Sequence, residues 1–362
     1  MKIRFIAMVL LGLIGCKQAA TDRNSTRESA DSTTVVNTIE SPEEAIARLT
    51  KLIKDNPKDY GLLQERALTQ YARDSFSLAI RDIDLALKMY PQSPDLHYLK
   101  GVFTKTTGDS TTAIEEFQQS VAMGTQNPEA HYELGQQFFF RQNYDAALKA
   151  YQTAASLNKQ EPLYVFAQAF LEESRGKPSK ALNLYRQTLE VDSLFVKALT
   201  QIHDVYFQTF KSPKDAKIYN DRLLAYFPSH PLGQFQRGTR QLSIATMTDR
   251  EAEEQRFAEA INGAVEAFTI AINSDPNYFD AYFSRGFSYI LGGQRIDLAT
   301  SDFEKCLALN PNHAQTHFWL GSIQEKYQDF ASALSYYETA LRLSPGEQDF
   351  IDAVNELKGK VR

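Results

Sequence analysis

The chain has 362 residues, with 39 Lys and Arg against 45 Asp and Glu, and only two cysteines. A net charge of −6 lacks the clustered positive charge with which proteins displace counterions from nucleic acid, so no nucleic acid is expected as a partner. Neither cysteine belongs to a CxxC pair and the six histidines are scattered, so we expect no metal and no cofactor.

The first residues are typical of an export signal. Lys2 and Arg4 precede a ten-residue apolar run over residues 5–14. Ten helical residues span about 15 Å, half of the roughly 30 Å hydrocarbon core of a bilayer, so this run is too short to cross a membrane. A basic segment followed by a short apolar one predicts a signal peptide over residues 1–15.

The end of this segment, Leu13-Ile14-Gly15-Cys16, resembles the lipobox of bacterial lipoproteins. The resemblance implies a diacylglycerol thioether on Cys16, cleavage before it and acylation of the new amino terminus, which together anchor a protein stably to a membrane. The residue directly after the cysteine is Lys17 rather than Asp, and in the sorting pattern of bacterial lipoproteins this favours the outer membrane. We therefore expect an envelope protein that faces the periplasm, with surface exposure as an alternative. The competing interpretation is an ordinary signal peptide followed by a chance cysteine.

The next segment changes from polar tether to helix. Residues 17–40 are rich in Ser, Thr, Asp and Asn and have too few large apolar side chains to form a core, so residues 16–41 are predicted to be the lipidated cysteine and a flexible tether. Ser41, Pro42 and Glu44 then form the start signal of a helix, with an N-cap, a proline in the first turn and a capping-box glutamate. They open an amino-terminal capping helix within residues 42–59.

From residue 60 the sequence recurs about every 34 residues. Each unit has a small residue, then about twelve positions later an alanine, four positions on a residue that is aromatic in six units, and then a second small residue. The alanine occurs in all eight units, at Ala79, Ala113, Ala147, Ala181, Ala216, Ala264, Ala299 and Ala333. This pattern resembles the tetratricopeptide repeat, in which paired antiparallel helices stack into a right-handed superhelix. The resemblance implies an all-α solenoid of eight repeats, at 60–93, 94–127, 128–161, 162–195, 196–230, 231–278, 279–313 and 314–347.

Close packing explains the pattern, because a small residue lets the two helices of a repeat approach and the aromatic fills the space beside it. The fifth unit departs from it, with His203 at the small position and Asn220 at the aromatic one. The small residues of the other units are Ala67, Gly101, Gly135, Ala169, Gly238, Gly286 and Gly321.

The sixth unit, 231–278, is fourteen residues longer than the usual 34. Thr248 and Glu251 resemble a capping box, so we expect a second helix lengthened at its start, with Glu251, Glu253 and Glu254 projecting. This insertion is either simply tolerated or a projection that binds a partner. At the end of the chain, Phe350, Val354 and Leu357 form one apolar stripe and predict a carboxyl-terminal capping helix within 348–362.

In the tetratricopeptide family the first helices line a concave groove that binds partner peptides. The resemblance places ten aromatic residues there: Tyr98, Tyr132, Phe139, Phe166, Phe170, Phe207, Phe235, Phe283, Phe287 and Phe318. They either pack neighbouring first helices together or accept apolar peptide segments. The family's carboxylate clamp of Lys, Asn and Arg is not matched at these positions.

No grouping of side chains favours catalysis, and Cys306, at a small position of its repeat, is expected to be a buried free thiol. The expected protein is a non-enzymatic, lipid-anchored scaffold for protein–protein interactions in a bacterial envelope complex for assembly, secretion or murein remodelling. Its partners would be envelope proteins or peptide segments, and the membrane through the anchor. The alternative is a lipoprotein that binds glycans or small ligands in an aromatic-lined groove.

Overall fold

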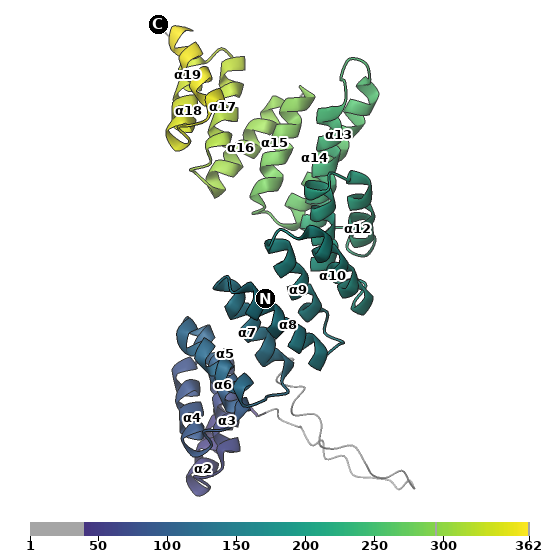
Figure 1. Cartoon of the computed structure of the whole chain (residues 1–362). Coiled ribbons are helices and arrows are strands. Elements are labelled where there is room, and N and C mark those ends of the chain that lie inside the picture. Colours follow the sequence, from purple (N-terminus) through teal and green to yellow (C-terminus); the bar gives the residue numbers. More distant parts are fainter. Residues whose placement is uncertain (1–39, 294, 361–362) are drawn as a thin grey trace, which may run out of the picture. The chain divides into compact units, whose positions relative to one another are not determined.

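The structure is a computed structural model that describes residues 40–293 and 295–360 (Figure 1). The predicted signal peptide, Cys16 and nearly all of the predicted tether lie outside these residues. Within the described part every regular element is a helix and there is no strand, which confirms the all-α prediction.

Helices follow one another as a series of hairpins, with one further helix before the first hairpin and one after the last. Short loops join them, and the fifth hairpin also contains a π-helix, η1. In chain order the helices are α2 (Pro42–Asp55), α3 (Tyr60–Ala72), α4 (Phe76–Met89), α5 (Pro94–Thr106), α6 (Ser110–Ala122), α7 (Pro128–Phe140), α8 (Tyr144–Leu157), α9 (Pro162–Ser174), α10 (Pro178–Val191), α11 (Val196–Asp204), η1 (Val205–Thr209), α12 (Pro213–Tyr226), α13 (Pro231–Met247), α14 (Glu254–Ser274), α15 (Phe279–Gly292), α16 (Ile296–Leu309), α17 (Ala314–Lys326), α18 (Phe330–Leu343) and α19 (Gln348–Lys360).

The hairpins fall into two compact units, one ending at Tyr164 and the other beginning at Val165. In the first unit a core cluster joins α3, α4 and α5 around Leu63, Ile83 and Phe103. In the second, separate clusters follow one another along the chain, each shared by consecutive helices. The core is therefore a row of local clusters, as expected where each repeat contacts only its neighbours.

Local signals in the sequence set the helix ends. The Ser41 hydroxyl accepts the Glu44 N–H at 3.2 Å and the Glu44 carboxylate accepts the Ser41 N–H at 2.8 Å, which confirms the predicted capping box. Asp109 and Asp329 cap α6 and α18 in the same manner, with a side-chain oxygen on the first turn. Since these oxygens satisfy N–H groups that have no partner in the helix, they define the residues at which α2, α6 and α18 begin.

The predicted close approach of the two helices in a repeat is confirmed. At Gly101, an added Cβ would lie 2.7 Å from the ring of Phe117, and at Gly238 it would lie 2.5 Å from the ring of Phe268. Both rings are completely buried. The small residue therefore leaves the space that the aromatic of the second helix fills.

The fifth repeat has polar residues at both positions of this contact, His203 for the small residue and Asn220 for the aromatic one. His203 is 2% exposed and stacks on Phe207 with ring centroids 5.7 Å apart, while Asn220, at the position of the aromatic, is fully buried. At this point α11 widens into η1, where the Phe210 N–H donates to the Val205 carbonyl at 3.1 Å. The exchange of small and aromatic for histidine and asparagine thus accompanies a local change of helix type.

Side-chain hydrogen bonds satisfy several buried groups of this repeat, although the buried His203 Nε2 has no hydrogen-bond partner among the described residues. The Asn220 amide donates to the Gly233 carbonyl at 2.9 Å, and its oxygen accepts from the Arg240 guanidinium at 3.2 Å. Gln236 donates to the Asp204 carboxylate at 2.9 Å. These contacts join α11, α12 and α13 through polar groups, in addition to the apolar cluster around Leu199, Ile202 and Leu223.

The sixth repeat differs from the prediction in where its extra residues lie. They lengthen both helices: α13 runs to Met247 and α14 begins at Glu254. Thr248 ends α13, and the Asp249 carboxylate accepts the N–H groups of Glu251 and Ala252 at 3.0 and 3.2 Å within the connecting loop. The predicted capping box is therefore a loop, because Asp249 rather than Thr248 binds the free N–H groups.

Candidate functional site

Six of the ten predicted groove aromatics occupy the fifth position of a repeat, and each packs on the aromatic of the second helix in the same repeat. Ring centroids are 5.3 Å apart for Phe318 and Tyr337 and 6.2 Å apart for Tyr98 and Phe117, and the other four pairs lie between these values. The remaining first partners are Tyr132 with Tyr151, Phe166 with Tyr185, Phe235 with Phe268, and Phe283 with Phe303.

Five of the six also contact a ring in, or just before, the first helix of the next repeat or the capping helix α19. Phe166 lies 5.4 Å from Phe195, and Phe318 lies 5.0 Å from Phe350. Tyr132, Phe235 and Phe283 make the corresponding contacts with Tyr164, Tyr278 and His313. These side chains are half-buried and join neighbouring repeats, so packing is their observed role; a role in binding partners stays a prediction.

The other four predicted groove residues differ among themselves. Phe207 and Phe287 are half-buried against His203 and Trp319, respectively. Phe139 is half-buried beside Phe140, and Phe170 is exposed and stacks on Phe166. Sequence reasoning passed over Phe140, although it ends a run of three phenylalanines at the close of α7 and is 72% exposed.

The first helices of the second and third repeats border a hollow of about 350 Å³ in the first unit. Its walls are polar: Lys105 Nζ lies 2.5 Å from Glu133 Oε2, and the Gln136 amide donates to the Tyr132 hydroxyl at 2.6 Å. Phe140 adds an exposed ring. The full lining is Lys105, Ser110, Tyr132, Glu133, Gln136, Gln137 and Phe140.

The chemistry of this hollow is that of a recognition surface. Burial raises the pKa of Tyr132 to about 12, so its hydroxyl stays protonated near neutral pH and can donate a hydrogen bond. Amide, ammonium and carboxylate groups stand beside one large apolar ring, without a nucleophile held by a base in this lining. Such a set can bind an extended main chain and one apolar side chain.

The predicted acidic projection is exposed. Glu251 and Glu253 lie in the loop before α14 and Glu254 is its first residue. Glu253 accepts from Arg256 at 2.7 Å. Whether these carboxylates bind a partner stays a prediction.

No three His, Cys, Asp or Glu side chains in residues 40–293 and 295–360 are grouped so that they could hold a metal ion. No helix of the described chain has the length and apolar character needed to cross a membrane. Cys306 is a buried free cysteine, as predicted.

Comparison with protein families gives one match, to the tetratricopeptide repeat, over residues 106–162 and 291–347. The two stretches lie one in each unit and together include the hairpins α7–α8 and α17–α18. The chain contains tetratricopeptide repeats.

Known proteins with such repeats resemble this chain in part. It is 22% identical to Hsp70-Hsp90 organizing protein 2 of Arabidopsis thaliana over 239 residues, which are 59% of this chain and 41% of that protein. The chain thus spans less than half the length of that relative.

Two solved structures are similar in fold. A tetratricopeptide repeat protein from Parabacteroides merdae aligns with a TM-score of 0.51 and 18% identity, over 74% of this chain and 99% of that one. A chain of the APC/C hetero-tetramer Cut9-Hcn1 aligns with a TM-score of 0.54 and 15% identity, over 88% and 60%. At these identities the likeness shows a tetratricopeptide-type solenoid of helical hairpins and nothing about partners.

Proposed function

We propose that this protein is a lipid-anchored tetratricopeptide scaffold that binds peptide segments of other bacterial envelope proteins along its first helices. The hollow between α5 and α7 is the observation that carries the binding part of the proposal. The lipobox-like segment ending at Cys16 carries the anchoring part.

The hollow favours a peptide over other ligands. An extended peptide offers N–H and C=O groups along its whole length, and the polar walls at Lys105, Gln136 and the Tyr132 hydroxyl can pair with them. Phe140 supplies a large apolar contact at small entropic cost, which is the character of a binding hot spot.

Phe140 is the best residue with which to test the proposal. It is 72% exposed, so its replacement does not remove core packing, whereas Phe166 and Phe283 contact two helices each and their truncation would disturb the fold. We expect Phe140→Ser to lose partners that wild-type protein captures by cross-linking in intact envelopes. Tyr226→Ser, at a 63% exposed aromatic on the second helix α12, is the matched control and should keep them.

Unchanged partners in Phe140→Ser would contradict the proposed binding site. Capture of no protein, together with binding to a glycan array, would replace the scaffold by the glycan-binding alternative.

The anchor has a separate test. In bacteria fed labelled palmitate, wild-type protein should take up label and sediment with membranes, because several acyl chains hold a protein there stably. Cys16→Ser should do neither. Membrane association that survives this substitution would contradict the lipid anchor and leave the peptide-binding part intact.

A further inference from the structure

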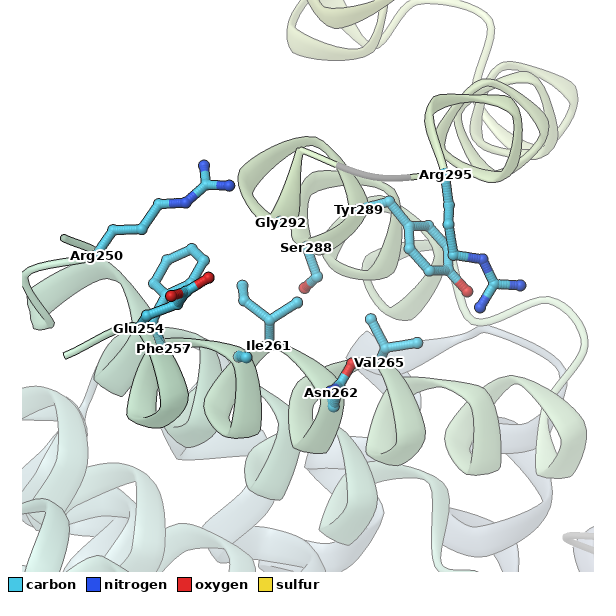
Figure 2. A pocket seen from close by; sticks show the side chains of 11 residues that line it. Arg250, Glu254, Phe257, Ile261, Asn262, Val265, Ser288, Tyr289, Gly292 and Arg295 are labelled. Atoms are coloured by element: carbon cyan, nitrogen blue, oxygen red, sulfur yellow. The ribbon is translucent and has the colours of Figure 1, made fainter.

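A cavity of about 190 Å³ lies between the start of α14 in the long sixth repeat and the end of α15 in the seventh, within the second unit (Figure 2). Its floor is an apolar stripe of Phe257, Ile261 and Val265, which face the cavity from successive turns of α14. Phe257 and Ile261 are each 7% exposed and pack with Ala245 of α13. The added turns at the start of α14 therefore supply one end of the cavity through Glu254 and Phe257.

Two arginines bound the cavity. Arg250 lies at the end near Phe257, with its guanidinium carbon 5.3 Å from the centre of that ring. Arg295 lies at the other end, 5.7 Å from the centre of the Tyr289 ring. A guanidinium on an aromatic face is held in place while its N–H edge stays available to an acceptor.

Neither arginine has a carboxylate partner among the described residues, although both line the same cavity. Of the two acidic residues adjacent to Arg250 in sequence, Asp249 accepts the backbone N–H groups of Glu251 and Ala252, and Glu251 does not line the cavity. Arginines elsewhere in the described chain that do pair with a carboxylate are Arg48, Arg66, Arg73, Arg237, Arg240, Arg256 and Arg285.

The charge balance of the cavity is positive. Glu254 is the single carboxylate of its lining, against two guanidinium groups. The volume of about 190 Å³ is below the roughly 300–1,000 Å³ of pockets that take whole small molecules, so the cavity suits one side chain of a larger ligand.

Spacing along α14 indicates the form of that ligand. Phe257 and Val265 are eight residues apart, which is about 12 Å along a helix. An extended peptide covers this length in about four residues at roughly 3.3 Å each. Acidic side chains four residues apart could thus lie near the two arginines while an apolar side chain between them enters the cavity.

We propose that this cavity binds a short acidic peptide segment, with one apolar side chain on the floor formed by Phe257, Ile261 and Val265 and an acidic side chain toward each of Arg250 and Arg295. The site is separate from the hollow between α5 and α7, and goes beyond the function proposed above. The segment that binds here differs from the one proposed for that hollow in its negative charge and in the spacing of its acidic residues.

The probe is the peptide acetyl-EALAE-amide, titrated into the full chain by calorimetry. Replacing both glutamates, in acetyl-QALAQ-amide, should weaken binding by up to about twenty-five-fold, since each of the two exposed ion pairs contributes up to about five-fold. Replacing the leucine, in acetyl-EASAE-amide, should weaken it by about ten-fold or more, because the apolar contact in the cavity is lost.

Substitutions in the protein locate the site. Arg250→Gln and Arg295→Gln should each weaken binding of acetyl-EALAE-amide by about five-fold and reduce its salt dependence. Arg256→Gln is the matched control, because Arg256 is exposed on α14 near Arg250 in the chain, pairs with Glu253 and does not line this cavity. All three side chains are exposed, so none of the substitutions should unfold the protein.

Three results would overturn the proposal: no binding of acetyl-EALAE-amide at millimolar concentration, equal binding of acetyl-QALAQ-amide, or equal effects of Arg256→Gln and the two cavity substitutions. Phe140→Ser should leave the affinity for acetyl-EALAE-amide unchanged. The two proposed sites can therefore fail independently.

Discussion

At the scale of single residues, the hydrogen atom that serves as the side chain of a glycine decides how closely two helices approach. At Gly238 the ring of Phe268 occupies the position where a methyl group would lie. Since protein interiors are close-packed and the ring is fully buried, neither helix can yield without moving its neighbours.

We therefore expect Gly238→Ala to lower the free energy of unfolding by about 1–3 kcal/mol through overpacking. Gly346→Ala is the control, because no atom lies within 4 Å of the added methyl group, and it should change stability by no more than about 0.5 kcal/mol. Urea unfolding followed by circular dichroism measures both. Equal stability of the two variants would contradict close packing at Gly238.

Cys306 gives a second prediction at this scale. Burial raises the pKa of its thiol to about 12, and Sγ lies 3.8 Å from the Phe279 carbonyl as a weak donor. The thiolate is the reactive form and would appear only as the pH approaches that value, so the native thiol should not react with a disulfide reagent between about pH 7 and 9.

The variant Cys16→Ser isolates this thiol, because the chain has two cysteines. Absorbance of the released chromophore should show no reaction in the native protein and one thiol per chain after unfolding in guanidinium chloride. Prompt reaction of native protein would mean that Cys306 is accessible.

At the scale of helices, one buried ion pair recurs in both units and joins three consecutive helices each time. Arg66 of α3 donates to both oxygens of Asp82 at 2.7 and 2.8 Å and to the Thr50 hydroxyl at 3.0 Å. Arg285 of α15 does the same with Asp302 and Thr269. Both aspartates are buried, so each depends on its arginine for compensation of its charge.

Arg66→Met should therefore destabilise the protein by about 3–5 kcal/mol, because it leaves the Asp82 carboxylate buried without a partner. The double variant Arg66→Met/Asp82→Leu should recover most of that loss, since two apolar side chains need no compensation. Arg73→Met, which breaks an exposed pair with Glu43, should cost at most about 1 kcal/mol. Unfolding midpoints in urea measure all three, and a double variant no more stable than Arg66→Met would contradict the account.

Sequence patterns predicted most of the helices because they depend on contacts close in the chain. The alanine and aromatic positions determine the hairpins, and Ser41 and Glu44 specify where α2 begins. Lengthening of α13 was missed because Thr248 has the sequence of a cap, whereas the structure uses Asp249. The change to η1 begins two residues after His203, and the spacing of small and aromatic residues does not predict a change of helix type.

The candidate sites were predictable only in part, for a similar reason. Tyr132 was expected on the first-helix face and does line a hollow there, but the contribution of Lys105 comes from a different repeat. The cavity at Arg250 and Arg295 joins residues of the α13–α14 loop and the α15–α16 turn. No periodic pattern relates positions that far apart in the chain.

At the scale of the whole molecule, the row of local clusters implies that stability is also local. Within each unit a hairpin packs on the hairpins next to it in sequence, so a perturbation should reach neighbouring repeats and fade beyond them. The recurring ion pair offers a matched perturbation in each unit, through Asp82 and Asp302.

Asp82→Asn should therefore speed amide hydrogen exchange in α2, α3 and α4 and leave α14, α15 and α16 unchanged, because the weakened Arg66 contact joins only the former. Asp302→Asn should have the reverse effect. Hydrogen–deuterium exchange with mass spectrometry resolves these segments, and each variant is the control for the other. If either substitution sped exchange in both sets of helices, the repeats would unfold as one cooperative body, and a partner bound to one unit could then stabilise the other.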